Sequence, residues 1–136
     1  MIIISSIEIT NFRSIVKLDR KVNPNHLNII VGQNDIGKSN FLKALNLFFN
    51  GETEIGTLFR FTDDFSKYAI TPRKKAEEIT IRIEFQTPDR FKDKESLIWT
   101  KVWRREGLYK DEIKTKTGKQ PSGRGGALQW VRKIMY

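Results

Sequence analysis

The sequence contains no cysteine, and His26 is its only histidine. A chain without thiols forms no disulfide and offers no thiolate to a metal, and one imidazole cannot make a histidine metal cluster. No stretch approaches the roughly 20 uncharged apolar residues that a membrane span needs, and the N-terminus lacks the basic segment that begins a secretory signal. These absences predict a soluble protein without a membrane partner.

Acidic side chains are outnumbered two to one by basic ones in the second half of the chain. Residues 1–66 contain seven basic and seven acidic side chains, whereas residues 67–136 contain eighteen basic and nine acidic ones, so the whole net charge of +9 lies there. A basic half beside a neutral half suggests a surface for a polyanion, for which nucleic acid is the leading candidate. The alternative is a solvated face whose acidic partner belongs to another chain or domain.

The apolar content suffices for one domain, because 38% of the 136 residues are hydrophobic. Runs of β-branched or alternating apolar residues predict strands. These runs are 2–10, 15–18, 27–31, 79–85, 97–104 and 108–115. The last three follow one another and predict an antiparallel meander. Residues 52–75 show no clear period, and Pro72-Arg73-Lys74-Lys75 within them is expected to be an exposed connection.

A change of period from residue 38 predicts a helix. Apolar residues recur there at the i, i+3, i+4, i+7 spacing of one helical face, and others widen that face, so the helix is expected to be mostly buried. The helix should end at Asn50-Gly51, because both residue types tolerate the left-handed conformation of a C-cap. The apolar positions are Phe41, Leu42, Ala44, Leu45, Leu47, Phe48 and Phe49.

Between the strand predicted at 27–31 and this helix, residues 32–39 read Gly-Gln-Asn-Asp-Ile-Gly-Lys-Ser and fit the phosphate-loop (P-loop) pattern G-x-x-x-x-G-K-[ST]. The two glycines let successive amides converge on phosphate oxygens at the start of the helix. Lys38 would reach the β- and γ-phosphates, and the Ser39 hydroxyl would bind Mg²⁺. We therefore expect ATP, or alternatively GTP, with magnesium. The expected nucleotide-binding residues of this segment are Gly32, Asn34, Asp35, Ile36, Gly37, Lys38, Ser39 and Asn40.

Two segments carry a family resemblance: residues 7–15, Ile-Glu-Ile-Thr-Asn-Phe-Arg-Ser-Ile, and residues 31–45 around the loop. Together they resemble the amino-terminal lobe of the ATPase heads of RecF, SMC and OLD-family proteins, which are ABC-type ATPases acting on DNA. The Gly-x-Asn start of the loop is common to this group. Asp35, where SMC and RecF proteins usually have glycine, is similar to the OLD-family nucleases, including the Gabija-type defence ATPase. The resemblance is specific over residues 1–51 and looser over the meander.

The fold that this resemblance implies is α/β: the N-terminal lobe of a P-loop NTPase of the ABC-type head, with strand, P-loop and helix plus an antiparallel β meander. Residues 1–136 would form this lobe as part of a longer protein. Within it we expect a P-loop core at 1–51, an antiparallel β subdomain at 76–116 and a flexible basic loop at 117–126. Residues 127–136 are expected to begin a helix.

The resemblance also implies roles for single residues. The turn at Asn11 to Ser14 would lie near the nucleotide, with Arg13 a candidate contact to its phosphates; a solvated arginine at a strand-end turn is the alternative. Gln86, after a predicted strand, is a candidate for the glutamine that ABC-type heads place on Mg²⁺ and the attacking water, or else an ordinary polar residue. Asp63 and Asp64 could bind a second metal ion, although a surface turn fits that segment better.

The chain lacks two parts that an ABC-type head needs for hydrolysis: an apolar strand ending in Asp-Glu after the P-loop, and a Ser-Gly-Gly signature segment. No catalytic residue is therefore assigned within it, and the rest of the head is expected in cis or in trans. The resemblance implies a cytoplasmic ATPase that forms a homodimer through its heads and acts on DNA, with phage defence as one setting and a linked nuclease as one extension. The alternatives are a nucleotide-sensing module that does not hydrolyse ATP and the nucleotide-binding subunit of an ABC transporter.

Overall fold

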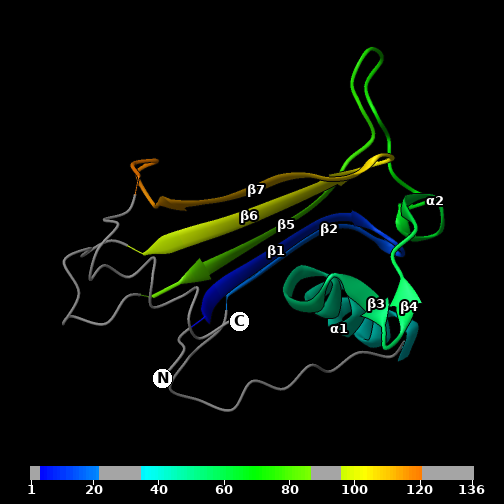
Figure 1. Cartoon of the computed structure of the whole chain (residues 1–136), viewed down its shortest axis with the longest axis horizontal. Helices are drawn as coiled ribbons and strands as arrows, with labels where there is room; N and C mark the ends of the chain where they lie inside the picture. Colours follow the sequence, from blue (N-terminus) through cyan, green and yellow to red (C-terminus); the bar gives the residue numbers. More distant parts are fainter. Residues whose placement is uncertain (1–3, 22–34, 87–95, 121–136) are drawn as a thin grey trace.

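The computed structural model describes residues 4–21, 35–86 and 96–120. Its centre is a five-stranded sheet in the order β2-β1-β5-β6-β7, in which every neighbouring pair is antiparallel, and helix α1 lies against one face of this sheet (Figure 1). The strands of the sheet are β1 (Ile4–Phe12), β2 (Ile15–Lys21), β5 (Ile79–Phe85), β6 (Leu97–Arg104) and β7 (Gly107–Thr115).

The predicted meander of β5, β6 and β7 is confirmed, with bounds that differ from the sequence prediction only at the start of β7. The first two strands join this meander, because β1 pairs along β5 with Ile7 opposite Ile83 and Ile9 opposite Ile81. Strands from both predicted parts of the chain, 1–51 and 76–116, therefore share one sheet. The strand predicted at 27–31 lies outside the described residues, as do residues 121–136.

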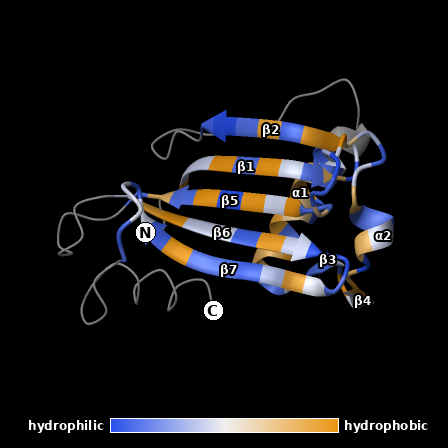
Figure 2. Cartoon of the chain, turned by 90° about the horizontal axis from the view of Figure 1, so that it is seen from above, coloured by the Kyte–Doolittle hydropathy of each residue, from blue (hydrophilic) through white to orange (hydrophobic). Residues whose placement is uncertain are grey.

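Apolar and polar residues alternate along the strands, as the hydropathy colours of β5 and β6 in Figure 2 show. One parity faces α1 and forms the core, whereas the other carries charged side chains such as Arg82 and Glu84. This alternation is the pattern of an antiparallel sheet with one covered face. The fully or nearly fully buried apolar residues of the core are Ile7, Ile9, Phe12, Ala44, Leu47, Phe48, Phe61, Ile79, Ile81, Ile83, Phe85, Leu97, Trp99, Trp103 and Ile113.

Helix α1 spans Asp35–Asn50 and so begins three residues before the predicted start at Lys38. Its first turn needs no apolar face, which is why the periodicity gave no sign of it. The predicted end is confirmed, because Gly51 has φ 75° and its N–H donates to the carbonyl of Leu47 at 3.0 Å. Leu42 was expected on the buried face, and this was wrong: its side chain is 59% exposed.

Regular structure also occurs within residues 52–75, where none was predicted. Hairpin strands β3 (Glu52–Glu54) and β4 (Thr57–Leu58) follow α1, and the four-residue helix α2 (Phe61–Asp64) comes next. Each element is too short to display a period, so the sequence pattern could not reveal it. The exposed connection predicted around Pro72 to Lys75 is confirmed, since these four residues are exposed.

Candidate nucleotide-binding site

The N-terminus of α1 supplies the backbone groups of the candidate site. Because the helix begins at Asp35, the amides of Asp35, Ile36, Gly37 and Lys38 have no carbonyl partner within the helix. These N–H groups and the positive end of the helix dipole favour a bound anion such as phosphate. Lys38 is half-buried and Ser39 is exposed at this end. Gly32 and Asn34, also expected in the site, lie outside the described residues.

The turn between β1 and β2 has an unusual backbone. Asn11 has φ 61° and Arg13 has φ 49°, and non-glycine residues rarely adopt such left-handed angles. The Asn11 side chain donates through Nδ2 to the carbonyl of Glu78 at 3.3 Å. Its left-handed conformation breaks the alternation of β1, so that Phe12 turns into the core. Strained turns of this kind occur where the surrounding structure imposes them, often at functional sites.

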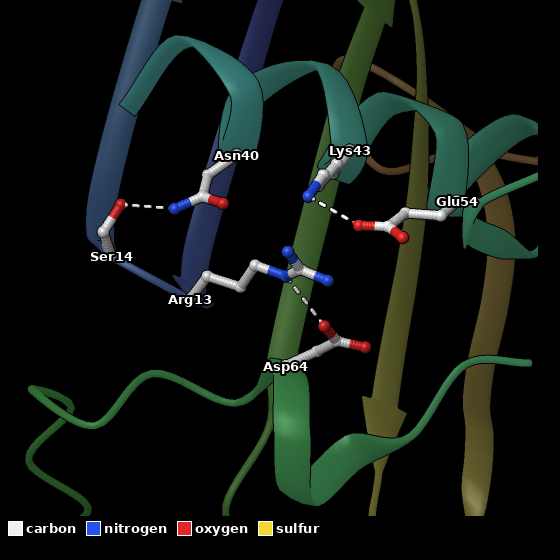
Figure 3. A network of polar contacts seen from close by, with 6 residues as sticks. All are labelled: Arg13, Ser14, Asn40, Lys43, Glu54 and Asp64. Atoms are coloured by element: carbon white, nitrogen blue, oxygen red, sulfur yellow. Dashed lines mark hydrogen bonds and ion pairs between the residues drawn. The ribbon is translucent and has the colours of Figure 1, made fainter. Parts of the chain in front are cut away.

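Arg13 is held in this turn by Asp64 of α2 (Figure 3). Its backbone N–H donates to the Asp64 carbonyl at 2.7 Å, and its Nε donates to Asp64 Oδ1 at 2.8 Å. The guanidinium also lies 5.6 Å from the centre of the Phe12 ring. The terminal nitrogens of Arg13 form no hydrogen bond with any residue that the structure describes. They are therefore available to a ligand, while Nε fixes the plane of the group.

Two sequence interpretations are corrected here. Arg13 is not merely solvated, because its side chain is only 25% exposed and is ion-paired. The segment containing Asp63 and Asp64 is not simply a surface turn either, since Asp64 is buried in α2 while Asp63 is exposed. No group of three potential metal ligands occurs among the described residues, and Asp64 is engaged by an arginine.

Two further polar contacts fasten α1 to its neighbours (Figure 3). Asn40 is buried, and its Nδ2 donates to Ser14 Oγ at 2.8 Å, which joins the helix to the β1–β2 turn. Lys43 Nζ lies 2.7 Å from Glu54 Oε1, which joins the helix to β3. The hydrogen bond and charge of Lys43, with a smaller effect of Arg13, hold the pKa of the Glu54 carboxyl below its usual range. Ser14 is thus fixed to α1 at Asn40, and Arg13 precedes it directly in the same turn.

A cleft of about 420 Å³ lies between the β1–β2 turn, the β3–β4 hairpin and α2. Its size is within the range of small-molecule sites, and two arginines contribute to its wall. The lining residues are Arg13, Thr53, Gly56, Thr57, Leu58, Arg60, Asp63 and Asp64. None of these except Arg13 was assigned to a nucleotide site from the sequence, because they come from elements without a visible period.

Gln86 is not brought to these residues. It is exposed and follows Phe85, which pairs with Ile4 at the far end of β1 from Arg13. Thr80 pairs with Thr10 near the Arg13 end of β1, and Gln86 lies six positions further along the chain. Six positions of extended chain span about 20 Å at the rise of a β-strand. Its role as a magnesium ligand stays a prediction from the sequence.

Lys101 of β6 was missed by the sequence analysis. It is buried on the core face, where its Nζ donates to the carbonyl of Phe48 at 2.7 Å and lies 4.9 Å from the ring centres of Phe48 and Trp99. That carbonyl is one of the last four of α1, which have no partner within the helix. The cation therefore caps the negative end of the helix whose other end forms the candidate site. The sequence did hold a signal for this burial, because Lys101 alternates with Trp99 and Trp103 and so falls on the same face of β6 as these two residues.

An antiparallel sheet with a helix on one face, bonded near its N-terminal end to the arginine-bearing β1–β2 turn, has the architecture of the N-terminal lobe of a P-loop ATPase head. Residues 1–129 match the AAA ATPase domain family, and the chain belongs to this family. The resemblance seen in the sequence is thereby confirmed at the level of the family and the fold.

Individual relatives agree with this placement. The chain is 33% identical over 94 residues to the endonuclease GajA of Bacillus cereus (strain VD045), a match that covers 69% of this chain and 15% of that protein. A solved structure from work on ATP-driven dimerisation and DNA-stimulated activation of SMC ATPases has a TM-score of 0.62 at 21% identity, covering 88% of this chain and 72% of the other. The RecF–ATP structure has a TM-score of 0.57 at 20% identity, covering 91% and 29%.

The chain therefore spans only about a seventh of the length of GajA, and these structures at such low identity show the fold alone. No helix in the described part of the chain is long and apolar enough to cross a membrane.

Proposed function

We propose that this chain is the ATP-binding lobe of an ATPase that works on DNA, with the phosphates of ATP at the N-terminus of α1. The family supports ATP binding. The observation that carries the placement combines three features: amides of the first turn of α1 that have no carbonyl partner within the helix, the side chains of Lys38 and Ser39 there, and the bond from Asn40 of α1 to Ser14, the chain neighbour of Arg13. The amides, Lys38 and Arg13 each favour a phosphate over a neutral ligand.

The residues fit nucleotide and magnesium in distinct ways. Lys38 and the terminal nitrogens of Arg13 would neutralise phosphate oxygens, and the cleft beside Arg13 has room for the nucleoside. Ser39 is exposed at the helix terminus, where its hydroxyl would be one ligand of Mg²⁺. A magnesium ion bound with ATP takes its other ligands from phosphates and water, so one hydroxyl is a sufficient protein contribution.

The same geometry supports binding without hydrolysis by this chain alone. Attack on the γ-phosphate needs a group that positions water in addition to neutralised phosphate charge. Two carboxylates near Arg13 and α1 are engaged, Asp64 by Arg13 and Glu54 by Lys43, and the sequence lacks the apolar strand ending in Asp-Glu that would supply another. We therefore propose a composite site completed by the rest of the head or by a second head, consistent with the ATP-driven dimerisation named for the SMC relative. Nuclease activity of the complete protein is proposed from the likeness to the endonuclease GajA, and phage defence from the OLD-family resemblance of the P-loop segment.

Calorimetric titration with ATP and Mg²⁺ tests the placement. We expect Lys38→Ala to lower ATP affinity by about 10- to 100-fold, the value of a hydrogen bond to a charged group, while the circular dichroism spectrum stays unchanged. The matched control is Lys17→Ala, which removes an exposed lysine from β2 and should leave affinity within about twofold. Equal affinities of both variants and the unmodified chain would remove Lys38 from the site.

A further inference from the structure

Residues 67–76 form an arm between α2 and β5 that projects beyond the sheet (Figure 1, green). The base of this arm is fixed to the core. Ser66 is buried, its N–H donates to the Asn11 carbonyl at 2.9 Å, and its Oγ accepts a hydrogen bond from the N–H of Tyr68 at 3.3 Å. The arm is thus an exposed segment whose first residues are hydrogen-bonded to the core.

A hydrogen-bonded turn closes the end of the arm. The N–H of Lys75 donates to the carbonyl of Pro72 at 3.0 Å, and Lys74 at the third position of the turn has φ 69°. A lysine seldom adopts this left-handed angle, which glycine or asparagine would adopt at less cost. Arg73, Lys74 and Lys75 are all exposed, so the turn presents three consecutive cations to solvent.

The positive charge of the arm is not neutralised locally. Lys67, Arg73, Lys74 and Lys75 form no ion pair with any described residue, and residues 67–76 include no acidic side chain. The arginines at the nearby β6–β7 turn differ, because Arg104 is paired with Glu78 at 3.5 Å and Arg105 with Glu77 at 3.0 Å. Four uncompensated cations within ten residues indicate a partner that carries several negative charges.

Two apolar side chains accompany these cations. Tyr68 is 71% exposed and Ile70 is 92% exposed, and both lie on the limb of the arm that leads to the turn. An exposed aromatic ring next to cations is the combination that binds single-stranded nucleic acid, in which phosphates meet lysine and arginine while unpaired bases stack on rings. An acidic protein surface would use the cations but leave Tyr68 without a stacking partner.

We propose that the arm of residues 67–76 binds single-stranded nucleic acid, with Arg73, Lys74 and Lys75 on the phosphates and Tyr68 stacked on an unpaired base. This proposal rests on the proposed function, from which it takes DNA as the polyanion. It adds which segment of the chain binds the DNA and that the bound DNA is single-stranded. The arm is separate from the ATP site, so the two assignments fail independently.

Fluorescence anisotropy with a labelled single-stranded 20-mer and the full chain tests the phosphate contacts. Changing Arg73, Lys74 and Lys75 together to glutamate should weaken binding and reduce the slope of log affinity against log salt concentration by about 2, because three contacts to a single strand are lost. The control makes the same change of charge on the edge strand β2, at its exposed Lys17, Arg20 and Lys21. If the control loses as much affinity and slope as the turn variant, binding follows net charge and the arm has no special role.

Variants of Tyr68 test the stacking. Tyr68→Ala should lower affinity for the single strand by about 5- to 100-fold, whereas Tyr68→Phe, which keeps the ring, should stay within about twofold. Affinity for a duplex of equal length should be unaffected by Tyr68→Ala. A duplex that binds as tightly as the single strand and is equally weakened would overturn the strandedness.

Two more outcomes overturn the proposal and separate it from the ATP site. Vesicles of anionic lipid that bind the arm while the 20-mer does not would show that the arm contacts membranes. A chain that binds ATP but no nucleic acid would defeat both the arm and the proposed action on DNA. A chain that binds the 20-mer with unchanged affinity after the three changes at the turn would leave the action on DNA standing and defeat the arm alone.

Discussion

The Arg13 side chain illustrates how single residues build the site. Its Nε and backbone N–H are both bound by Asp64, which lies 51 positions later in the chain. The sequence indicated Arg13 through its place in a family-like turn and Asp64 only as a metal ligand or surface residue. It gave no sign that the two are paired, because a contact at this separation leaves no local pattern. Ser14 and Asn40 are a similar case: both were noted near the nucleotide, and only the structure shows that they bond to each other.

At this scale we expect Asp64→Asn to lower the free energy of unfolding by about 1.5 to 3 kcal/mol, the value of a hydrogen bond to a charged group. The carboxylate is buried beside a partly exposed guanidinium, so the remaining cation loses its counter-charge. Urea denaturation measures the change. The neighbouring Asp63→Asn is the control, and because Asp63 is exposed its effect should stay within about 0.5 kcal/mol. Equal effects of the two substitutions would refute a structural role for the ion pair.

At the scale of elements, the strands of the meander and the end of α1 could be predicted, because alternation and a glycine C-cap are local signals. The pairing of β1 with β5 could not, since it joins segments about 70 residues apart. The elements β3, β4 and α2 could not be predicted either, because they are too short to show a hydrophobic period. These are the elements that line the cleft, so the part of the site outside the P-loop was the least predictable part.

Helix α1 gives a second expected outcome. Lys101→Met should destabilise the chain by about 1.5 to 3 kcal/mol, because it leaves the Phe48 carbonyl at the C-terminus of the helix without this donor. The midpoint of urea denaturation is the measurement. Lys110→Met on β7 is the control: Lys110 is about half-exposed and paired with Glu112 at 3.4 Å, and such surface pairs contribute less than about 1 kcal/mol. A Lys101 variant as stable as the Lys110 variant would show that the cap is dispensable.

At the scale of the whole molecule, the charge of the chain is divided between a neutral half with the P-loop and a basic half with the arm. The sequence located this division but did not show which of the basic side chains are neutralised by ion pairs. The structure shows that several cations of the basic half are consumed by local ion pairs, such as Arg105 with Glu77 and Lys116 with Glu84, whereas the four cations of the arm are not.

A lobe of this kind should bind ATP without turning it over. We expect phosphate release by the purified chain to stay well below about 1 s⁻¹, the low end of ordinary enzyme turnover, because the sequence lacks the apolar strand ending in Asp-Glu that would position water, and Asp64 and Glu54 are held in ion pairs. Lys38→Ala, assayed in parallel, measures the background from contaminating enzymes. Turnover near 1 s⁻¹ or faster that is lost in Lys38→Ala would mean that the chain hydrolyses ATP unaided.

The central claim is that ATP binds where the N-terminus of α1 meets the β1–β2 turn. Titration of the ¹⁵N-labelled chain with ATP and Mg²⁺, followed by nuclear magnetic resonance, tests it most directly, because every backbone amide reports its own surroundings. We predict the largest shifts at the amides of residues 35–40 and of Arg13 and Ser14, and their loss in Lys38→Ala. Shifts concentrated on β5 to β7 or on the arm, or shifts at residues 35–40 that persist in Lys38→Ala, would contradict the claim.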